Sequence, residues 1–561
     1  MSTADLNRRE FVKWAGAGAL VLGRSALHAK PRADTPSRPN VILIITDDQG
    51  YGDMSCHGNP KLKTPNIDRL QAEGTELSHF YVEPVCAPTR ACLMTGRYNY
   101  RTGVTDTYLG RAMMHAEEVT LAEMLGAAGY ATGIFGKWHL GDNYPLRPED
   151  QGFGEALVHN GGGIGQPSDP PGSGYFDPVL RHNGTWQKRK GYCTDVFFDA
   201  AMAFIEKSRG KPFFAYIPTN CPHSPFQIAE KYWRPFRQMG LDDGTAKVYG
   251  MIANIDENIG RLLAKLDALK LADNTIVIFL TDNGPNGRRY NCGLRAHKGS
   301  VYEGGIRTAF FVRWPARLKA GRKVACVGAH IDVAPTLLAA CGVPKPAGVA
   351  FDGISLLPFL LGAKVDGPDR TIYLQWHRGD VPQPFRACAA RGPRYKLVNG
   401  KELYDLAADP GEKKDLAAER GDVVKKMRAD YEAWFKDVSS TRGYDPPRIH
   451  LGTPHENPTT LTRQDWRGPR AGWGRNSLGH WEVLVAKAGT FEIKLRFFRG
   501  ADDGQAVFRM GKLERKGPIK KGDGSCTFAK VDLPAGPGRL EAWVEVGKRA
   551  VGVRYVDVKR L

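Results

Sequence analysis

The sequence predicts an α/β fold: a large, mostly parallel central sheet with helices on both faces. Residues 40–46 (NVILIIT) and 275–280 (TIVIFL) are continuous apolar runs, as expected of strands whose two faces are both covered. Strand-like and helix-like segments alternate between these runs, which is typical of parallel sheets. The chain has 561 residues, more than one small core requires, so additional domains are expected.

The other elements of the α/β part follow from caps, breakers and periodicity. Thr64 and Pro65 precede a helical pattern that stops at Gly74, which predicts a helix with Thr64 as its cap. Apolar residues at helical spacing between residues 247 and 269 predict a long amphipathic helix. Residues 141–190 are rich in glycine and proline and are expected to form a long loop. The remaining expected elements are strands at 75–82, 131–135 and 213–217 and a helix at 121–128.

The sequence pattern changes after residue 370. Short strands in TIYLQW, YKLVNG and ELYDL, followed by a helix at 423–438, predict a small antiparallel subdomain. A proline-rich stretch follows, and then a period of two, as in WEVLVAKAGTFEIKLRFF, predicts a separate all-β sandwich. The expected domains are an export signal at 1–30, a main domain at 38–445 (α/β part 38–370, smaller subdomain 371–445), a linker at 446–458 and an accessory β-sandwich at 459–561.

The N-terminus resembles a twin-arginine export signal. Arg8 and Arg9 stand in the order NRREFVK, before an apolar run at 15–23 that is far shorter than the ~20 residues needed to span a bilayer. We therefore expect export through the twin-arginine translocon to the periplasm or beyond, with no stable membrane span. Such proteins fold in a reducing cytosol before export, so few disulfides are expected among the ten cysteines.

The chain is strongly basic, with a formal net charge of +19. Removal of the segment up to Ala29, which carries four basic and two acidic residues, leaves +17. This charge favours an anionic partner. The basic residues are scattered and no nucleic-acid motif is found, so small or polymeric anions are favoured over nucleic acid.

Acidic pairs follow the two apolar strands. Asp47 and Asp48 come after the first, and Asp282 and Asn283 come after the second. Ligands of open α/β sheets bind outside the carboxyl ends of the strands, so these pairs are expected to converge. An aspartate in either place alone is as well explained by a turn or a helix cap. Together they offer an all-oxygen set suited to a hard divalent cation, with Ca²⁺ ahead of Mg²⁺ because no phosphate-binding loop accompanies it.

Cys86 lies in the stretch PVCAPTRACLMTGRY, residues 84–98. A thiolate is a soft ligand and is poorly matched to an oxygen-coordinated ion. Either Cys86 lies elsewhere, or it is no longer a thiol in the working protein. We expect it to be exposed to the cleft, whereas Cys92 is expected to be a core residue.

Several motifs in this order resemble those of the type I sulfatase family, in the alkaline phosphatase superfamily, over residues 40–434. They are CAPTR at 86–90 with TGR at 95–97, GYATGIFGKWHLG at 129–141, DNG at 282–284, HKGSVYEGGIR at 297–307 and ELYDLAADPGE at 402–412. The resemblance implies an alkaline phosphatase-like sheet and a sulfuric ester hydrolase of the arylsulfatase type.

The resemblance also implies a modified nucleophile. In that family the motif cysteine is oxidised to formylglycine (3-oxoalanine) before export, by a formylglycine-generating enzyme that reads the cysteine, the proline and the arginine. Here these would be Cys86, Pro88 and Arg90. Hydrated formylglycine is a geminal diol with hard oxygens, which would place Cys86 among the neighbours of the metal and remove the ligand mismatch.

The implied reaction is covalent. One diol hydroxyl attacks the sulfur of a sulfate ester while an acid protonates the leaving alcohol, and the other hydroxyl then expels sulfate. Arg90 would orient the diol, and Lys137 and Lys298 would hold sulfate oxygens. His139 and His223 would handle protons and the leaving group. The role of Arg97 is left open.

Two alternatives to sulfate ester hydrolysis remain at this point. A phosphonate or phosphate ester hydrolase would share the metal site, and a non-catalytic glycan-binding relative would share only the scaffold. The basic charge favours a sulfated carbohydrate as the natural substrate. The β-sandwich is equally well explained as a polysaccharide-binding module or as a lid or stability module. Trp466 and Trp473, expected to be exposed near its start, could stack on sugar rings, although buried tryptophans are at least as common in sandwiches.

Overall fold

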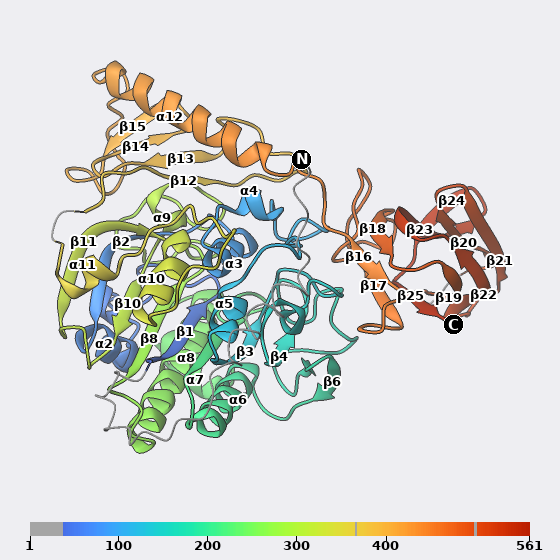
Figure 1. Cartoon of the computed structure of the whole chain (residues 1–561), viewed down its shortest axis with the longest axis horizontal. Coiled ribbons are helices and arrows are strands. Elements are labelled where there is room, and N and C mark those ends of the chain that lie inside the picture. The colour runs from blue at the N-terminus through green and yellow to red at the C-terminus, as the bar shows by residue number, and fades with distance from the viewer. Residues whose placement is uncertain (1–37, 365–366, 499–501) are drawn as a thin grey trace, which may run out of the picture.

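The computed structural model describes residues 38–364, 367–498 and 502–561. An α/β domain carries a small antiparallel sheet at one end, and a β-sandwich stands to one side (Figure 1). The predicted fold class is therefore confirmed. The expected export signal at 1–30 lies outside the described residues. No helix in the described part of the chain is both long enough and apolar enough to cross a bilayer.

The central sheet has the strand order β11-β2-β10-β8-β1-β7-β3-β4-β5-β6, and β9 pairs with β2. Its middle is parallel: β8, β1, β7, β3 and β4 all run the same way. The strands are β1 (Asn40–Thr46), β2 (Thr75–Tyr81), β3 (Ala131–Lys137), β4 (Glu155–His159), β5 (Val179–His182), β6 (Thr185–Lys188), β7 (Phe213–Pro218), β8 (Thr275–Thr281), β9 (Arg307–Thr308), β10 (Phe310–Arg313) and β11 (Arg322–Ala329).

The five central residues of β1 are all apolar, and the structure shows why. Successive side chains of a strand point to opposite faces. Val41, Leu43 and Ile45 belong to one core cluster, and Ile42 and Ile44 to the other. Helices α3, α5, α10 and α11 supply the first cluster, and α2, α6 and α8 supply the second. Both faces are covered, which is why residues 41–45 are all apolar.

The helices of the main domain are α2 (Pro65–Ala72), α3 (Cys86–Thr95), α4 (Asn99–Thr102), α5 (Leu121–Ala127), α6 (Cys193–Ser208), α7 (Glu230–Gln238), α8 (Asp243–Ala268), α9 (Glu303–Ile306), α10 (Val333–Ala340) and α11 (Leu357–Leu361). Short 3₁₀ turns occupy Ser55–His57, Pro148–Gln151 and His330–Asp332. Thr64 is the N-cap residue of α2, as predicted, but its hydroxyl donates to the Asp68 side chain and does not accept a hydrogen bond from the helix backbone.

The glycine-rich region 141–190 is not one long loop. It contains β4, which extends the parallel sheet beyond β3, and the antiparallel strands β5 and β6, which form its edge. Long-range pairing with β3 makes β4 a strand, and the local composition gives little sign of this.

The smaller subdomain packs against the main domain, with α12 (Gly421–Ser440) lying across its sheet (Figure 1). The sheet has the order β12 (Ile372–Gln375), β13 (Cys388–Arg391), β14 (Tyr395–Val398) and β15 (Glu402–Asp405), all antiparallel. Trp434 of α12 joins Tyr98 and Tyr100 of the main domain in one buried cluster. The subdomain is therefore fixed to the region that follows α3.

The C-terminal sandwich consists of two sheets. One has the order β16-β18-β23-β20-β21 with β24 on β23, and the other β17-β25-β19-β22. The strands are β16 (Ile449–Leu451), β17 (Thr459–Thr462), β18 (His480–Val485), β19 (Gly489–Arg496), β20 (Gly504–Met510), β21 (Leu513–Ile519), β22 (Ser525–Leu533), β23 (Gly536–Val546), β24 (Arg549–Gly552) and β25 (Tyr555–Arg560). Strand β16 lies inside the segment expected as linker, yet it pairs with β18 as part of the sandwich.

The two tryptophans singled out in the sandwich differ in exposure. Trp466 is fully buried, so the expectation that it is exposed is wrong; it packs against Trp481. Trp473 is 38% exposed. Only Trp473 is available to a ligand.

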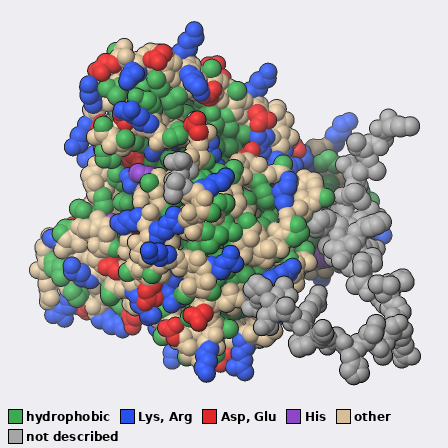
Figure 2. Space-filling model, turned by 60° about the vertical axis from the view of Figure 1, so that its left-hand side comes forward, with side chains coloured by type: hydrophobic (Ala, Val, Ile, Leu, Met, Phe, Trp, Pro, Cys, Tyr) green, Lys and Arg blue, Asp and Glu red, His purple; other side chains and the backbone are tan. Residues whose placement is uncertain are grey.

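Charged side chains of both signs are mixed on one face of the molecule (Figure 2). On the face shown in Figure 2, the described Lys and Arg side chains are interspersed with Asp and Glu and form no continuous basic tract.

All ten cysteines lie in the described residues, and all are free thiols.

Candidate active site

Four neighbouring parallel strands deliver the predicted site residues to one edge of the sheet. In the order β8-β1-β7-β3, their carboxyl ends are followed by Asp282, Asp47, His223 and His139, and Lys137 is the last residue of β3. Parallel register aligns these ends, since Thr46 pairs with Thr281. The two acidic pairs therefore converge as expected.

Each of two lysines pairs with one aspartate of the first pair. Lys137 Nζ donates to Asp47 Oδ2 at 2.6 Å, and both side chains are fully buried. Lys298 Nζ pairs with Asp48 Oδ1, which also accepts from Asn283 Nδ2 at 2.9 Å. The attraction of Lys298 and His223 overcomes the opposing effect of burial and lowers the pKa of Asp48, so this carboxylate stays charged.

Arg90 and Cys86 come from α3, which begins at Cys86 itself. Arg90 Nη2 donates to Asp282 Oδ2 at 2.8 Å, and its Nη1 donates to the Lys137 carbonyl at 3.1 Å. Ligand atoms of Asp47, Cys86 and Asp282 all lie within 4.8 Å of one another. The Cys86 side chain is only 3% exposed because these neighbours surround it, so the expectation of exposure to the cleft is wrong.

Several oxygens at this edge are buried without a partner. Among the described residues, Asp47 Oδ1, Asp48 Oδ2 and Asn283 Oδ1 make no hydrogen bond. Buried polar atoms normally have a hydrogen-bond partner. Carboxylate and amide oxygens without such a partner are the ligand atoms that a hard cation prefers. The residues present therefore fit a Ca²⁺ ion.

The two histidines face the same edge with different nitrogens free. His139 Nε2 hydrogen-bonds to the Thr107 carbonyl at 2.7 Å, which makes Nε2 the protonated nitrogen and leaves Nδ1 unpaired among the described residues. His223 Nδ1 donates to the Ser224 carbonyl at 2.6 Å, and its Nε2 lies 3.8 Å from Asp48 Oδ2. Burial lowers the pKa of His223 to about 4 and that of His139 well below its usual range.

Two site residues adopt a backbone conformation that is uncommon for residues other than glycine. Asp48 has φ +66° and His139 has φ +62°, both in the left-handed region. Residues held there cluster at functional sites, where the surrounding structure fixes them. Gly284 has a different constraint: a Cβ would lie 1.9 Å from the Gly304 carbonyl oxygen, so the backbone after Asn283 can approach α9 only as glycine.

His159 belongs to this environment and was missed from the sequence. It is buried at the end of β4, and its Nε2 has no partner among the described residues. Burial, with the nearby charges of Lys137 and Arg90, lowers its pKa to about 3. Recognising EALVH as a strand would have placed this histidine at a strand end.

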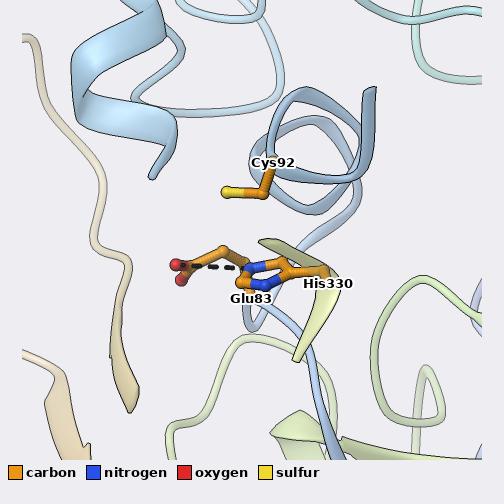
Figure 3. Close-up of side chains that lie close together, drawn as sticks. All are labelled: Glu83, Cys92 and His330. Carbon is orange, nitrogen blue, oxygen red and sulfur yellow. Dashed lines mark ion pairs between the residues drawn. The ribbon is translucent and has the colours of Figure 1, made fainter. Parts of the chain in front are cut away.

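Arg97, whose role was left open, and Cys92, which was expected in the core, both lie apart from the acidic edge. Arg97 Nη1 pairs with Glu118 at 3.1 Å, a structural contact. Cys92 is fully buried, as expected, and lies above the pair Glu83 and His330 (Figure 3). Glu83 Oε1 is 3.7 Å from His330 Nε2. This group shares no residue with the acidic edge and is separate from it.

Comparison with known proteins gives a consistent result. Residues 39–343 match a family model described as Sulfatase, and residues 296–436 match one described as N-sulphoglucosamine sulphohydrolase, C-terminal. An N-acetylgalactosamine-6-O-sulfatase of Bacteroides thetaiotaomicron is 30% identical over 73% of this chain and 95% of its own length. Arylsulfatase A of Homo sapiens is 31% identical over 66% of this chain and 77% of its own. The crystal structure of Ps i-CgsB in complex with k-i-k-neocarrahexaose superposes with a TM-score of 0.65, at 29% identity, over 71% of this chain and 93% of that one.

Proposed function

Because the chain belongs to the sulfatase family and is a sulfate ester hydrolase, we propose that it removes sulfate from a sulfated carbohydrate. The proposed nucleophile is formylglycine made from Cys86, and the proposed cofactor is Ca²⁺. The proposal rests on one observation: ligand atoms of Asp47, Cys86 and Asp282 all lie within 4.8 Å of one another.

The proposed ligands of Ca²⁺ are Asp47, Asp48, Asp282 and Asn283. Their donor atoms are all oxygens, and three oxygens of the set have no partner among the described residues. When bound, the ion supplies positive charge to the sulfate oxygens and to the nucleophile. Mg²⁺ is the less favoured ion because no phosphate-binding loop accompanies the site.

The unmodified Cys86 thiol is a poor nucleophile in this position. Burial raises its pKa, and the nearby Lys137 and Lys298 only partly oppose this effect. A protonated thiol is weakly nucleophilic, which supports conversion of the residue before catalysis. The hydrated aldehyde of formylglycine would supply a hydroxyl nucleophile with hard oxygens.

The remaining residues bind the sulfate and move protons. Lys137, Lys298 and Arg90 balance the charge of the three aspartates, and two of these cations are fully buried. A bound Ca²⁺ would then leave the site with a net positive charge, which attracts an anion. His139 Nδ1 carries no proton in this tautomer and has no partner among the described residues, so it is free to accept a proton. His223 Nε2 is the atom proposed to hold the proton for the leaving alcohol, because the negative charge of a bound ester favours the imidazolium form.

A carbohydrate substrate is supported by the relatives and by the charge of the chain. Two relatives are named as sulfatases of N-acetylgalactosamine, and one solved relative is in complex with k-i-k-neocarrahexaose. The formal net charge of +19 favours anionic polymers. Hydrolysis of phosphate or phosphonate esters is less favoured, since the matched relatives are named for sulfate.

The proposed partners before catalysis are a formylglycine-generating enzyme and the twin-arginine translocon. Cys86, Pro88 and Arg90 support the first, and the NRREFVK motif supports the second. The proposed location is the periplasm or the extracellular space.

The test is mass spectrometry of the peptide containing Cys86, with assays of aryl sulfate and aryl phosphate on the same preparation. We expect loss of sulfur and gain of an aldehyde at Cys86. We also expect faster hydrolysis of the aryl sulfate than of the aryl phosphate. Cys86→Ala should abolish sulfate release, whereas Cys92→Ala, a matched change in the same helix, should retain it. Faster phosphate turnover, or full sulfate release by a protein whose Cys86 is still a thiol, would overturn the proposal.

A further inference from the structure

A row of aromatic rings and one guanidinium extends from the active site toward the sandwich. A Cβ built on Gly299, the residue after Lys298, would lie 3.2 Å from the ring of Trp376. The Arg378 guanidinium lies 5.0 Å from the centroid of the Trp376 indole and 4.5 Å from that of the Tyr108 ring. We name Trp376, Arg378, Tyr108 and Trp473 the aromatic–arginine ladder.

The ladder crosses from the catalytic part of the chain into the sandwich. The rings of Tyr108 and Trp473 meet edge to face, with centroids 5.6 Å apart. Trp473 lies outside both matched family models, which end at residues 343 and 436. The outer end of the ladder is therefore a feature of this chain's own C-terminal domain.

The inner side of the ladder is anchored to the segment that holds a site histidine. Trp376 Nε1 and Arg378 Nη1 both donate to Asp106 Oδ1, at 3.0 and 2.8 Å. Asp106 is fully buried, and the next residue is Thr107, whose carbonyl pairs with His139 Nε2. Residues 106–108 thus connect the ladder and the site through three consecutive positions.

The outer side of the ladder is open. The side chain of Arg378 is 53% exposed and Trp473 is 38% exposed. Within the described part of the chain, Arg378 donates only through Nη1, to Asp106 and Thr107, so Nε and Nη2 are available to a ligand. A guanidinium held between two aromatic rings keeps its direction and loses little freedom on binding.

These groups match the chemistry of a sulfated glycan chain. Aromatic faces pack against apolar C–H faces of sugar rings, and a guanidinium recognises sulfate or carboxylate through paired hydrogen bonds. We propose that the aromatic–arginine ladder binds the sugars next to the one whose sulfate is cleaved, with Arg378 on a second anionic substituent and Trp473 on a sugar ring. This inference rests on the proposed function and narrows the substrate to an oligosaccharide or polysaccharide with repeated negative charge.

A cavity beside the sandwich is a competing location for the bound glycan. A cavity of about 710 Å³ between the two domains is lined by Trp186, Asn160 and His455, among others. Trp186 is 39% exposed, almost the same as Trp473, and is therefore a matched control. Arg539 is a matched control for Arg378, because its side chain is 68% exposed and pairs with one carboxylate, that of Glu482.

The experiment measures inhibition of aryl sulfate hydrolysis by the full-length modified enzyme. The probes are inorganic sulfate, a chondroitin 6-sulfate tetrasaccharide and a sulfated neocarrahexaose. We expect at least one oligosaccharide to inhibit more tightly than inorganic sulfate. Trp473→Ala should then weaken that inhibition about fivefold relative to inorganic sulfate, while Trp186→Ala leaves the ratio as in the parent.

A second variant tests whether the charge of Arg378 contributes to oligosaccharide binding. Arg378→Gln should weaken inhibition by the oligosaccharide and make it less dependent on salt, because a charge pair has been lost. Arg539→Gln should change neither property. A loss shared equally with inorganic sulfate would indicate damage to the site through Asp106 and would overturn the proposal.

Other outcomes also decide the question. If no oligosaccharide inhibits more tightly than inorganic sulfate, or if Trp186→Ala weakens inhibition and Trp473→Ala does not, the ladder is not the glycan site. Calorimetric binding of the same oligosaccharides to the full-length Cys86→Ala protein tests the ladder without turnover. Absence of sulfate release would therefore contradict the proposed function but not the ladder. Binding that does not depend on Trp473 would contradict the ladder but not the proposed function.

Discussion

Lys137 Nζ lies 2.6 Å from Asp47 Oδ2, and neither side chain has any exposed surface. The lysine is the last residue of β3 and the aspartate follows β1, so the pair joins strands on either side of β7. A buried charge requires a partner, and here each residue is the partner of the other. The contact thus links the sulfate-binding cation of the proposed mechanism to a proposed metal ligand.

Lys137→Met should reduce both activity and stability. Turnover of aryl sulfate should fall by about 10²–10³-fold, because a cation aimed at the developing charge is lost. The free energy of unfolding should fall by about 3–5 kcal/mol, because Asp47 is left without its partner. Lys207→Met, at a side chain that is 79% exposed, is the control and should change neither quantity. Parent-like turnover of the Lys137 variant would contradict the assigned role.

Removal of calcium should lower the melting temperature as well as the activity. Ligands that bind only the folded state stabilise it, by about 2.7 kcal/mol at a concentration 100-fold above Kd. Dialysis against EGTA should therefore lower Tm, and added Ca²⁺ should restore it more fully than Mg²⁺. Asn283→Leu, which removes an unpaired oxygen, should reduce the Ca²⁺-dependent rise in Tm measured by calorimetry. Identical Tm values with EGTA and with excess Ca²⁺ would exclude the ion.

Glu83 should make stability depend on pH. Burial raises the pKa of its carboxyl well above the ordinary value of 4.5, and burial lowers the pKa of His330 to about 3, so burial favours the neutral form of each group in the folded protein. Above pH 4.5 the unfolded chain releases the Glu83 proton and the folded chain keeps it, which lowers stability as pH rises.

Glu83→Gln removes this effect and keeps an oxygen for the Gln375 amide. The unfolding free energy of the variant minus that of the parent should therefore increase from pH 5 to pH 8, with a slope of up to about 1.4 kcal/mol per pH unit. Urea titrations at both pH values measure it. A constant difference would mean that Glu83 is charged in the folded state, as half of an ion pair with His330.

Export should depend on the arginine pair near the N-terminus. Replacing Arg8 and Arg9 with lysines keeps the charge but changes the motif, so we expect the protein to accumulate in the cytoplasm with Cys86 still converted. Cell fractionation followed by an aryl sulfate assay checks this. Unchanged export of the double variant would exclude the twin-arginine route.

Much of the site was predictable because its residues occupy strand ends. Residues 40–46 form β1 as predicted, and burial on both faces is what makes the run both apolar and recognisable. Once two such strands lie in one parallel sheet, geometry alone brings Asp47 and Asp282 to the same edge.

The parts that were missed depend on contacts between distant segments. Strand β4 has only five residues and becomes a strand by pairing with β3, so His159 carried no visible signal. The contact between Tyr108 and Trp473 joins two domains and leaves no periodicity in either sequence. The burial of Cys86 likewise depends on side chains from several strands, which no local pattern reveals.

The apolar interior of the sandwich continues into the catalytic part of the chain. Leu109, Met113 and Leu146 belong to the same cluster as Trp466 and Trp481. Deleting the residues after 445 would expose apolar side chains of the catalytic part to solvent. The separated sandwich would in turn lose the part of its hydrophobic core that these side chains supply, so both fragments are expected to aggregate. A transplant of the C-terminal module onto another enzyme would need those three residues rebuilt on its new host.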